Sequence, residues 1–139
     1  MSNGVKFSDV AKLRDGVIPR GTTVWKKLRD STIAELIVLE DGLIPESSRL
    51  QIQSKTKLMA GGNYRKCRVP AAYVVALYPS SWNTSCTPIT EGRSDYDYNF
   101  VYKLNEVVRP REYDTSEFIV CTNGLHVFLT RGEAEAYQF

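Results

Sequence analysis

Histidine is nearly absent from this chain of 139 residues, which contains only His126. Cysteine is also scarce: the three present are Cys67, Cys86 and Cys121, and no two of them form a Cys-x-x-Cys pair. One histidine and three scattered thiols do not make a zinc site of familiar spacing. An odd number of cysteines fits a reducing compartment better than a disulfide framework. We therefore expect no metal and no cofactor, and we expect the thiols to be core residues.

Long apolar segments are missing as well. No run of about 20 apolar residues occurs, so the sequence predicts no transmembrane helix. Residues 1–6 lack an apolar h-region, so we expect no secretory signal peptide. The composition, 42% hydrophobic and 24% charged, is that of an ordinary globular protein. The length predicts one domain spanning residues 1–139, and the missing segments predict a cytosolic protein with no membrane partner.

Familiar catalytic motifs are lacking too: no Walker glycine loop, no Gly-x-Gly-x-x-Gly and no His-Glu-x-x-His occurs. His126 lies between Leu125 and Val127 in a strand-like pattern, which favours a structural histidine over a general base. Asp95 and Asp97 form an Asp-x-Asp pair without an indicated third ligand, which favours a polar strand edge or turn over a metal or glycosidase site. The sequence therefore predicts a protein that is not an enzyme and has no catalytic residues.

Strand-forming patterns dominate what is present. Residues 22–28 and 32–39 are rich in β-branched side chains and predict two strands. Residues 71–77 form a continuous apolar run that predicts a central strand buried on both faces. Residues 98–104 and 106–108 predict a hairpin that turns at Asn105.

Further strands are expected at residues 49–53, 118–121 and 125–129. Short helices are expected at both ends, at residues 7–13 and from Thr130 to Tyr137. The second begins in a Thr-x-x-Glu capping box. The predicted fold is an α+β domain, mainly antiparallel β-sheet, with short terminal helices.

Charge is unevenly distributed, although the net charge is only +2. Residues 31–48 carry four acidic and no basic side chains, whereas residues 49–68 carry six basic and no acidic ones. A protein this close to neutrality is a poor candidate for coating bulk nucleic acid. One basic block suits a compact anionic ligand held by a few cations, or simply a solvated basic face.

Aromatic side chains accompany the basic residues, as in Trp25-Lys26-Lys27 and in the block around Cys67. Lysine and arginine bind phosphates, and flat rings stack on nucleobases. Even spacing also predicts that Tyr96, Tyr98 and Tyr102 project from one strand face. The candidate phosphate contacts are Arg65, Lys66 and Arg68, and the candidate stacking residues are Trp82, Tyr96 and Tyr98. The alternative is structural: Cys67 and Val69 would then point inward from a strand whose other face is basic.

Three segments together resemble an uncharacterised domain found in phages and giant viruses, where it is often attached to pentapeptide-repeat proteins. They are residues 64–75 (YRKCRVPAAYVV), 96–108 (YDYNFVYKLNEVV) and 121–134 (CTNGLHVFLTRGEA). The resemblance extends over about residues 20–139. Gly132 replaces a more common acidic residue, and Val127 replaces a more common phenylalanine. No repeat array accompanies the domain here, so the chain looks like a free-standing phage member.

The resemblance implies a phage protein acting in the host cytoplasm. Small phage proteins without enzymatic activity include sponges that sequester immune second messengers, the cyclic di- or trinucleotides of CBASS defence. We therefore expect an anti-CBASS sponge that holds a cyclic oligonucleotide without hydrolysing it, and that forms a homodimer or homotetramer. Three alternatives stay open: a protein-interaction module that blocks a host factor, a nucleotide-cleaving enzyme with unrecognised metal ligands, and a structural virion component.

Overall fold

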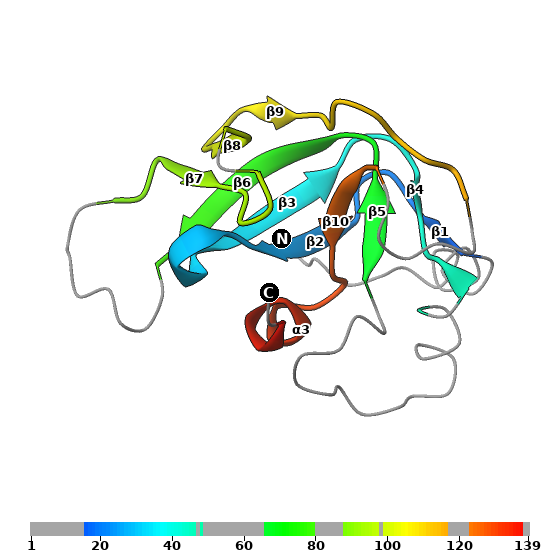
Figure 1. Cartoon of the computed structure of the whole chain (residues 1–139), viewed down its shortest axis with the longest axis horizontal. Helices are drawn as coiled ribbons and strands as arrows, with labels where there is room; N and C mark the ends of the chain where they lie inside the picture. Colours follow the sequence, from blue (N-terminus) through cyan, green and yellow to red (C-terminus); the bar gives the residue numbers. More distant parts are fainter. Residues whose placement is uncertain are drawn as a thin grey trace.

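The computed structural model describes residues 16–46, 48, 66–79, 88–97, 99–116 and 123–137. Short strands dominate this part of the chain (Figure 1). The elements are β1 (Val17–Ile18), β2 (Thr23–Lys27), the 3-10 turn η1 (Arg29–Ser31), β3 (Ile33–Val38), β4 (Gly42–Leu43), β5 (Cys67–Val69), β6 (Ala72–Tyr78), β7 (Glu91–Arg93), β8 (Val101–Lys103), β9 (Val107–Val108), β10 (Leu125–Val127) and the helix α3 (Arg131–Ala136).

The longest strands form one antiparallel sheet in the order β2-β3-β6-β9. The β-branched segments at residues 22–28 and 32–39 are its first hairpin, as the sequence predicts, with Thr23 opposite Ile37 and Lys27 opposite Ile33. Asp30 and Ser31 turn the chain between these strands with φ angles of 61° and 60°. Strand β6 lies inside the sheet between β3 and β9, which confirms a central strand for residues 71–77.

A second antiparallel sheet has the order β1-β4-β5-β10. Its last strand continues into an isolated bridge to β2, in which Trp25 and Phe128 exchange backbone hydrogen bonds of 2.8 and 2.7 Å. This bridge holds the carboxyl end of β10 against β2. It therefore brings residues near position 26 and near position 126 to the same place in the molecule.

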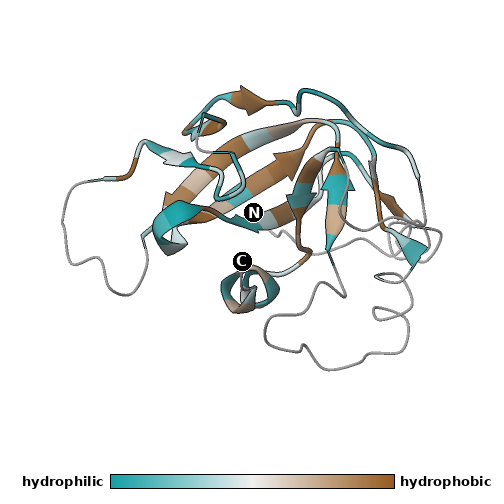
Figure 2. Ribbon diagram, in the orientation of Figure 1, coloured by the Kyte–Doolittle hydropathy of each residue, from teal (hydrophilic) through white to brown (hydrophobic). Residues whose placement is uncertain are grey.

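The core lies between the two sheets. Val24, Leu36 and Val74 from the first sheet and Val69 and Val127 from the second are completely buried in one cluster. Figure 2 shows hydrophobic residues concentrated along β3, β6 and β10, while hydrophilic residues colour the connecting segments and much of α3. Burial alternates along β6, so only one of its faces is fully covered. The prediction of burial on both faces was wrong, because the second face of β6 is only half-buried. A smaller cluster of Ile33, Phe128 and Ala134 covers part of that face, and Tyr78 at the end of β6 packs against it.

The hairpin expected at Asn105 does not form. Strand β8 pairs with β7, and β9 pairs with β6. Asn105 does turn the chain, with φ at 64°, but its backbone N–H donates to the carbonyl of Val74 at 2.9 Å. The edge of β6 thus takes the hydrogen bonds that a local hairpin would have used, and the pairing buries Val108. Long-range pairing overrode the local pattern.

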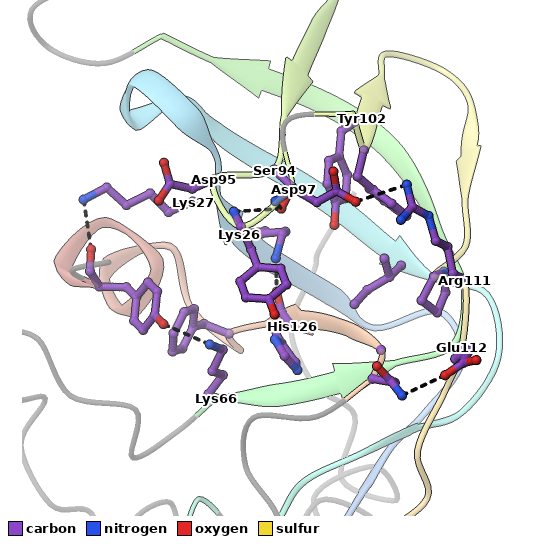
Figure 3. A pocket seen from close by; sticks show the side chains of 18 residues that line it. Lys26, Lys27, Lys66, Ser94, Asp95, Asp97, Tyr102, Arg111, Glu112 and His126 are labelled. Carbon is purple, nitrogen blue, oxygen red and sulfur yellow. Dashed lines mark hydrogen bonds and ion pairs between the residues drawn. The ribbon is translucent and has the colours of Figure 1, made fainter.

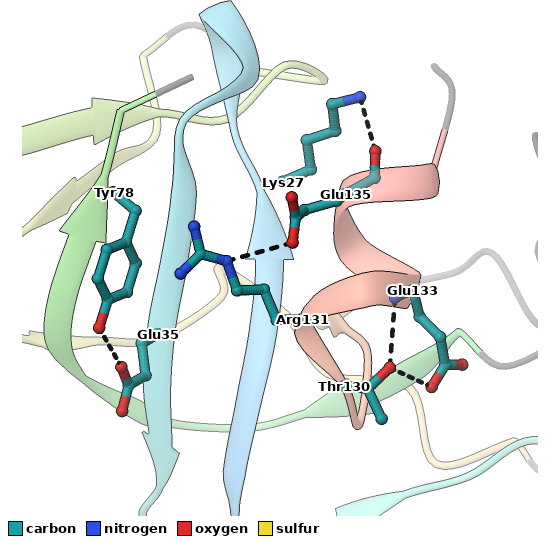
Figure 4. A network of polar contacts seen from close by, with 7 residues as sticks. All are labelled: Lys27, Glu35, Tyr78, Thr130, Arg131, Glu133 and Glu135. Atoms are coloured by element: carbon teal, nitrogen blue, oxygen red, sulfur yellow. Dashed lines mark hydrogen bonds and ion pairs between the residues drawn. The ribbon is translucent and has the colours of Figure 1, made fainter. Parts of the chain in front are cut away.

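The capping box at residues 130–133 begins α3, as the sequence predicts. The Thr130 side chain accepts a hydrogen bond from the Glu133 backbone N–H at 3.2 Å, and its hydroxyl donates to the Glu133 carboxylate at 2.8 Å (Figure 4). The described residues form a mainly antiparallel α+β fold that includes the short helix α3, which confirms the predicted fold class. The predicted helix at residues 7–13 and the strands at 49–53 and 118–121 lie outside the described residues.

Candidate functional site

A cleft of about 1000 Å³ opens where β2, β10 and α3 meet the segments at residues 94–97 and 110–112 (Figure 3). Its volume is at the upper end of the range typical for sites that bind small molecules. The Trp25–Phe128 bridge places β2 and β10 side by side at its floor. In Figure 3, Lys27 lies on the side of α3, whereas Arg111 and Glu112 lie on the opposite side.

Lys26 projects from β2 into this cleft. Its ammonium donates a hydrogen bond of 2.9 Å to the His126 carbonyl and lies 5.8 Å from the centre of the Tyr102 ring. Burial lowers the pKa of Lys26 from 10.5 to about 7, and the positive charge of Lys66 contributes to the decrease. A lysine with this pKa is about half protonated at neutral pH, whereas an ordinary surface lysine is fully charged.

Lys66 directly precedes β5, and its side chain lines the same cleft. Its ammonium donates to the Tyr137 hydroxyl at 2.9 Å and lies 4.7 Å from the centre of that ring. Lys27 donates to two backbone carbonyls, that of Glu135 within α3 at 3.4 Å and that of Tyr137 just beyond its end at 2.9 Å. The C-terminal helix therefore positions two of the three lysines of the cleft.

Aromatic rings alternate with these cations in the lining. Tyr102 and Phe100 lie 5.4 Å apart between ring centres, and Phe128 and Tyr137 lie 5.3 Å apart. Burial raises the pKa of Tyr102 far above its usual value, so its phenol is neutral. Tyr96, which also lines the cleft, is fully exposed at 100% of its surface. The cleft thus contains both buried rings and one ring that is free to pack against a ligand.

Acidic side chains also line the cleft, on the side away from α3 and along the segment before β8. Asp97 forms an ion pair with Arg111 at 3.1 Å, and Glu112 accepts a hydrogen bond of 3.0 Å from Asn123. Because Arg111 is already paired with Asp97 and Glu112 adds a negative charge, this edge offers an incoming anion less attraction than the lysines at the floor.

Two of the six site residues predicted from the sequence line the cleft: Lys66 and Tyr96. Arg65, Trp82 and Tyr98 lie outside the described residues. Tyr96 and Tyr102 do not share a strand face, because Tyr96 lies in the bend after β7 and Tyr102 lies on β8. The prediction from even spacing was wrong at this point: the chain bends at Ser94, whose hydroxyl accepts the backbone N–H groups of Tyr96 and Asp97.

Arg68, the remaining predicted phosphate contact, is completely buried and does not line the cleft. Its guanidinium donates to the backbone carbonyls of Asp114, at 3.2 Å, and Ser116. An arginine in this position satisfies the carbonyl groups of an irregular segment that lacks strand partners. We therefore assign Arg68 a structural role, and Lys66 is the member of the basic block that reaches the cleft.

The DUF5758 family, described as a family of unknown function, matches residues 14–134. The chain belongs to this family. No curated protein and no solved structure matches the chain. The matched range includes β2, the start of β5, β10 and most of α3, the elements that carry the three lysines and the floor of the cleft in this DUF5758 protein.

The lysines of β2 are the functional candidates that the sequence reasoning passed over. The Trp25-Lys26-Lys27 block showed the same mixture of rings and cations as the block around Cys67, and this signal was available. No local signal identified Tyr137 or Arg111 as residues that line the same cleft as these lysines. Their placement depends on pairing between β2 and β10, whose bonded residues lie about 100 positions apart.

His126 and Cys67 are the other side chains of reactive type near the cleft. His126 lines the cleft, is half-buried between the buried Leu125 and Val127, and accepts from Lys26 through its backbone carbonyl. Burial, followed by the nearby charge of Glu133, raises the pKa of the buried Cys67 thiol far above its usual value, so the thiol stays protonated. Within the described ranges, no three His, Cys, Asp or Glu side chains are grouped to hold a metal ion. No helix of the described chain is long and apolar enough to cross a membrane.

Proposed function

We propose that this DUF5758 protein binds a phosphate-bearing nucleotide in the cleft. The observation that carries the proposal is the convergence of Lys26, Lys27 and Lys66 with aromatic rings in one cleft of about 1000 Å³. Ammonium groups attract phosphates, and rings contribute about 1–3 kcal/mol for each base that stacks on them. A ligand that carries both phosphates and bases can contact both the lysines and the aromatic rings of this lining.

Within the nucleotides, we propose the cyclic di- and trinucleotides as ligands and sequestration as the activity. The resemblance to phage domains motivates this choice, and the charge pattern supports it. Several lysines match the two or three phosphates of such a ligand. A sponge must bind its messenger more tightly than the host effector does, so we expect a dissociation constant near nanomolar, about −12 kcal/mol.

The proposal includes the place of action and the assembly. We propose that the protein acts in the host cytoplasm as a homodimer or homotetramer, since closed symmetric assemblies are the common form of soluble oligomers. Light scattering at micromolar concentration tests the assembly. A mass near 15.7 kDa, that of one chain, would contradict it.

The decisive experiment mixes the purified protein with a panel of cyclic di- and trinucleotides, separates the complex, denatures it and analyses the released nucleotide by chromatography. Sequestration predicts an intact nucleotide in stoichiometric amount. Conversion to new products would identify a nucleotide-cleaving enzyme instead. If no nucleotide binds, the proposal is wrong, and a module that blocks a host protein or a structural virion component takes its place.

A further inference from the structure

The floor of the cleft holds two like charges close enough to affect each other. Lys26 comes from β2 and Lys66 from the start of β5, and the charge of Lys66 disfavours the protonated form of Lys26. The Lys26 ammonium donates to the His126 carbonyl, and the Lys66 ammonium donates to the Tyr137 hydroxyl. The carbonyl that accepts from Lys26 carries no negative charge.

Lys26 has unused donor capacity. An ammonium carries three N–H donors, and among the described residues the carbonyl of His126 is the only hydrogen-bond acceptor for Lys26. Its other close neighbour is the face of the Tyr102 ring, at 5.8 Å. Because Lys26 lines the cleft, a ligand bound there can reach the donors that the His126 carbonyl does not use. A bound oxyanion is the chemical group that would accept from these donors and relieve the repulsion with Lys66.

Among the described residues, no carboxylate forms an ion pair with Lys26. The other titratable groups lining the cleft are Lys27 on β2 itself, Lys66 before β5, Asp95 and Asp97 before β8, Tyr102 on β8, Arg111 and Glu112 after β9, His126 on β10, and Tyr137 after α3. Asp97 forms an ion pair with Arg111, and Glu112 accepts a hydrogen bond from the neutral amide of Asn123. On the neighbouring elements, Glu35 of β3 accepts from Tyr78 at 2.7 Å, and Oε1 of Glu133 in α3 accepts from Thr130 at 2.8 Å.

We propose that Lys26 and Lys66 form the phosphate subsite of the cleft, and that a phosphate group enters this subsite together with one proton, which Lys26 takes up from solvent. This inference rests on the proposed function for the identity of the whole ligand. It adds the position of one phosphate and a proton linkage. The ligand charge offsets the charge of Lys66, so the protonated form of Lys26 becomes favourable in the complex.

The test uses sulfate, an oxyanion that does not titrate near neutral pH and that binds without any base. The protein is labelled with ¹³C-lysine, and the Cε signal of Lys26, assigned by its loss in Lys26→Arg, is followed against pH. Spectra are recorded in sodium chloride and in sodium sulfate of equal ionic strength. We expect the pKa of Lys26 to rise from about 7 in chloride to roughly 8 or above in sulfate, a tenfold gain in proton affinity.

Two variants make the test specific. Lys66→Gln removes the like charge, so we expect a higher pKa for Lys26 in chloride and a smaller effect of sulfate. Lys103→Gln removes an exposed lysine of β8 that does not line the cleft, and we expect it to change neither value. The subsite is overturned if sulfate leaves the pKa of Lys26 at its chloride value, or if sulfate acts equally on wild type and Lys66→Gln.

The outcome is separable from that of the proposed function. If sulfate raises the pKa of Lys26 but no nucleotide in the panel binds, the subsite is confirmed and the nucleotide proposal is wrong. If cyclic nucleotides bind but sulfate does not affect Lys26, the nucleotide proposal is confirmed and the subsite is wrong.

Discussion

Lys66 and Arg68 stand two positions apart at the start of β5, yet they serve different regions of the molecule. Lys66 meets the side chain of Tyr137 in the cleft, whereas Arg68 is buried against the backbone of Asp114 and Ser116. One region lines a cleft with cations, and the other uses a cation to satisfy its own carbonyl groups. A basic block in a sequence can therefore contain both cleft-lining and structural residues. Only the hydrogen-bond acceptors around each side chain show which of the two it is.

The largest expected effect is on stability, at Arg68. Arg68→Met leaves the carbonyls of Asp114 and Ser116 without this donor, and each unsatisfied buried group costs about 1–3 kcal/mol. We expect the free energy of unfolding to fall by about 3 kcal/mol in urea denaturation. Nucleotide affinity, measured where the variant is still folded, should stay within about twofold of wild type, a small change for a residue outside the site.

Arg109→Met is the matched control for Arg68. Arg109 pairs with Glu40 on the surface, and its side chain is 61% exposed. Exposed ion pairs contribute about 0–1 kcal/mol, so the control should lose little stability. Equal losses in the two variants would contradict a structural role for Arg68.

A contrast between local and distant contacts also explains which parts of the fold could be predicted from the sequence. The hairpin of β2 and β3 and the start of α3 were predictable because their signals are local: β-branched residues on both sides of a short turn, and the Thr130–Glu133 capping box. The pairing of β9 with β6 was not predictable in this way. Asn105 marks a turn, but the partner of the following strand depends on which sheet edge lies nearest in space.

The cleft was less predictable than the fold, for a physical reason. Its key contacts join Lys26 to His126 and Lys66 to Tyr137, across 100 and 71 positions of the chain. Composition showed which residue types can hold an anion, and two of the residues proposed on that basis, Lys66 and Tyr96, line the cleft. It gave no means to exclude Arg68, because burial of an arginine depends on carbonyl groups that a distant segment supplies.

The next effect is on affinity, at Lys66. Lys66→Gln removes one charged donor from the proposed phosphate subsite, and a hydrogen bond to a charged group contributes about 1.5–3 kcal/mol. We expect the dissociation constant for a bound cyclic nucleotide to rise roughly 10- to 100-fold in calorimetry. The exposed Lys103→Gln variant should bind as wild type does. A similar loss in both variants would mean that net charge, and not the cleft, determines the affinity.

A pH series sharpens the comparison within the cleft, because the pKa of Lys26 lies near neutrality. With a pKa of about 7, Lys26 is about nine-tenths protonated at pH 6 and one-tenth protonated at pH 8. If the charged form binds phosphate, the affinity should fall about tenfold between these values. Lys26→Arg keeps the charge at both pH values, so its binding should be nearly constant. A flat profile for the wild type would argue against proton uptake.

Replacing the buried Lys26 is expected to stabilise the protein, whereas replacing Arg68 is expected to destabilise it. The pKa of Lys26 in the folded chain lies below its ordinary value of 10.5, so between pH 7 and 10.5 the unfolded chain binds more protons than the folded one. Stability therefore rises with pH across this window. We expect Lys26→Met to raise Tm at pH 7 by about 3 °C, on the order of 1 kcal/mol. The gap should shrink toward pH 10, as differential scanning fluorimetry at several pH values would reveal.

The smallest effect is expected at Arg111, on the side of the cleft opposite α3. This side chain is 73% exposed and is already paired with Asp97 at 3.1 Å, so a phosphate gains its attraction only by competing with that carboxylate. Exposed pairs of this kind contribute about 0–1 kcal/mol and are screened by salt. Arg111→Ala should therefore weaken nucleotide binding less than about threefold in calorimetry, whereas Lys66→Gln weakens it at least tenfold under the same conditions.

The double variant Arg111→Ala/Asp97→Ala removes both charges and should bind as wild type does. A loss at Arg111 as large as that at Lys66 would move the phosphate from the floor of the cleft to its edge, and would identify the exposed ring of Tyr96, near that edge, as the place to look for the stacked base.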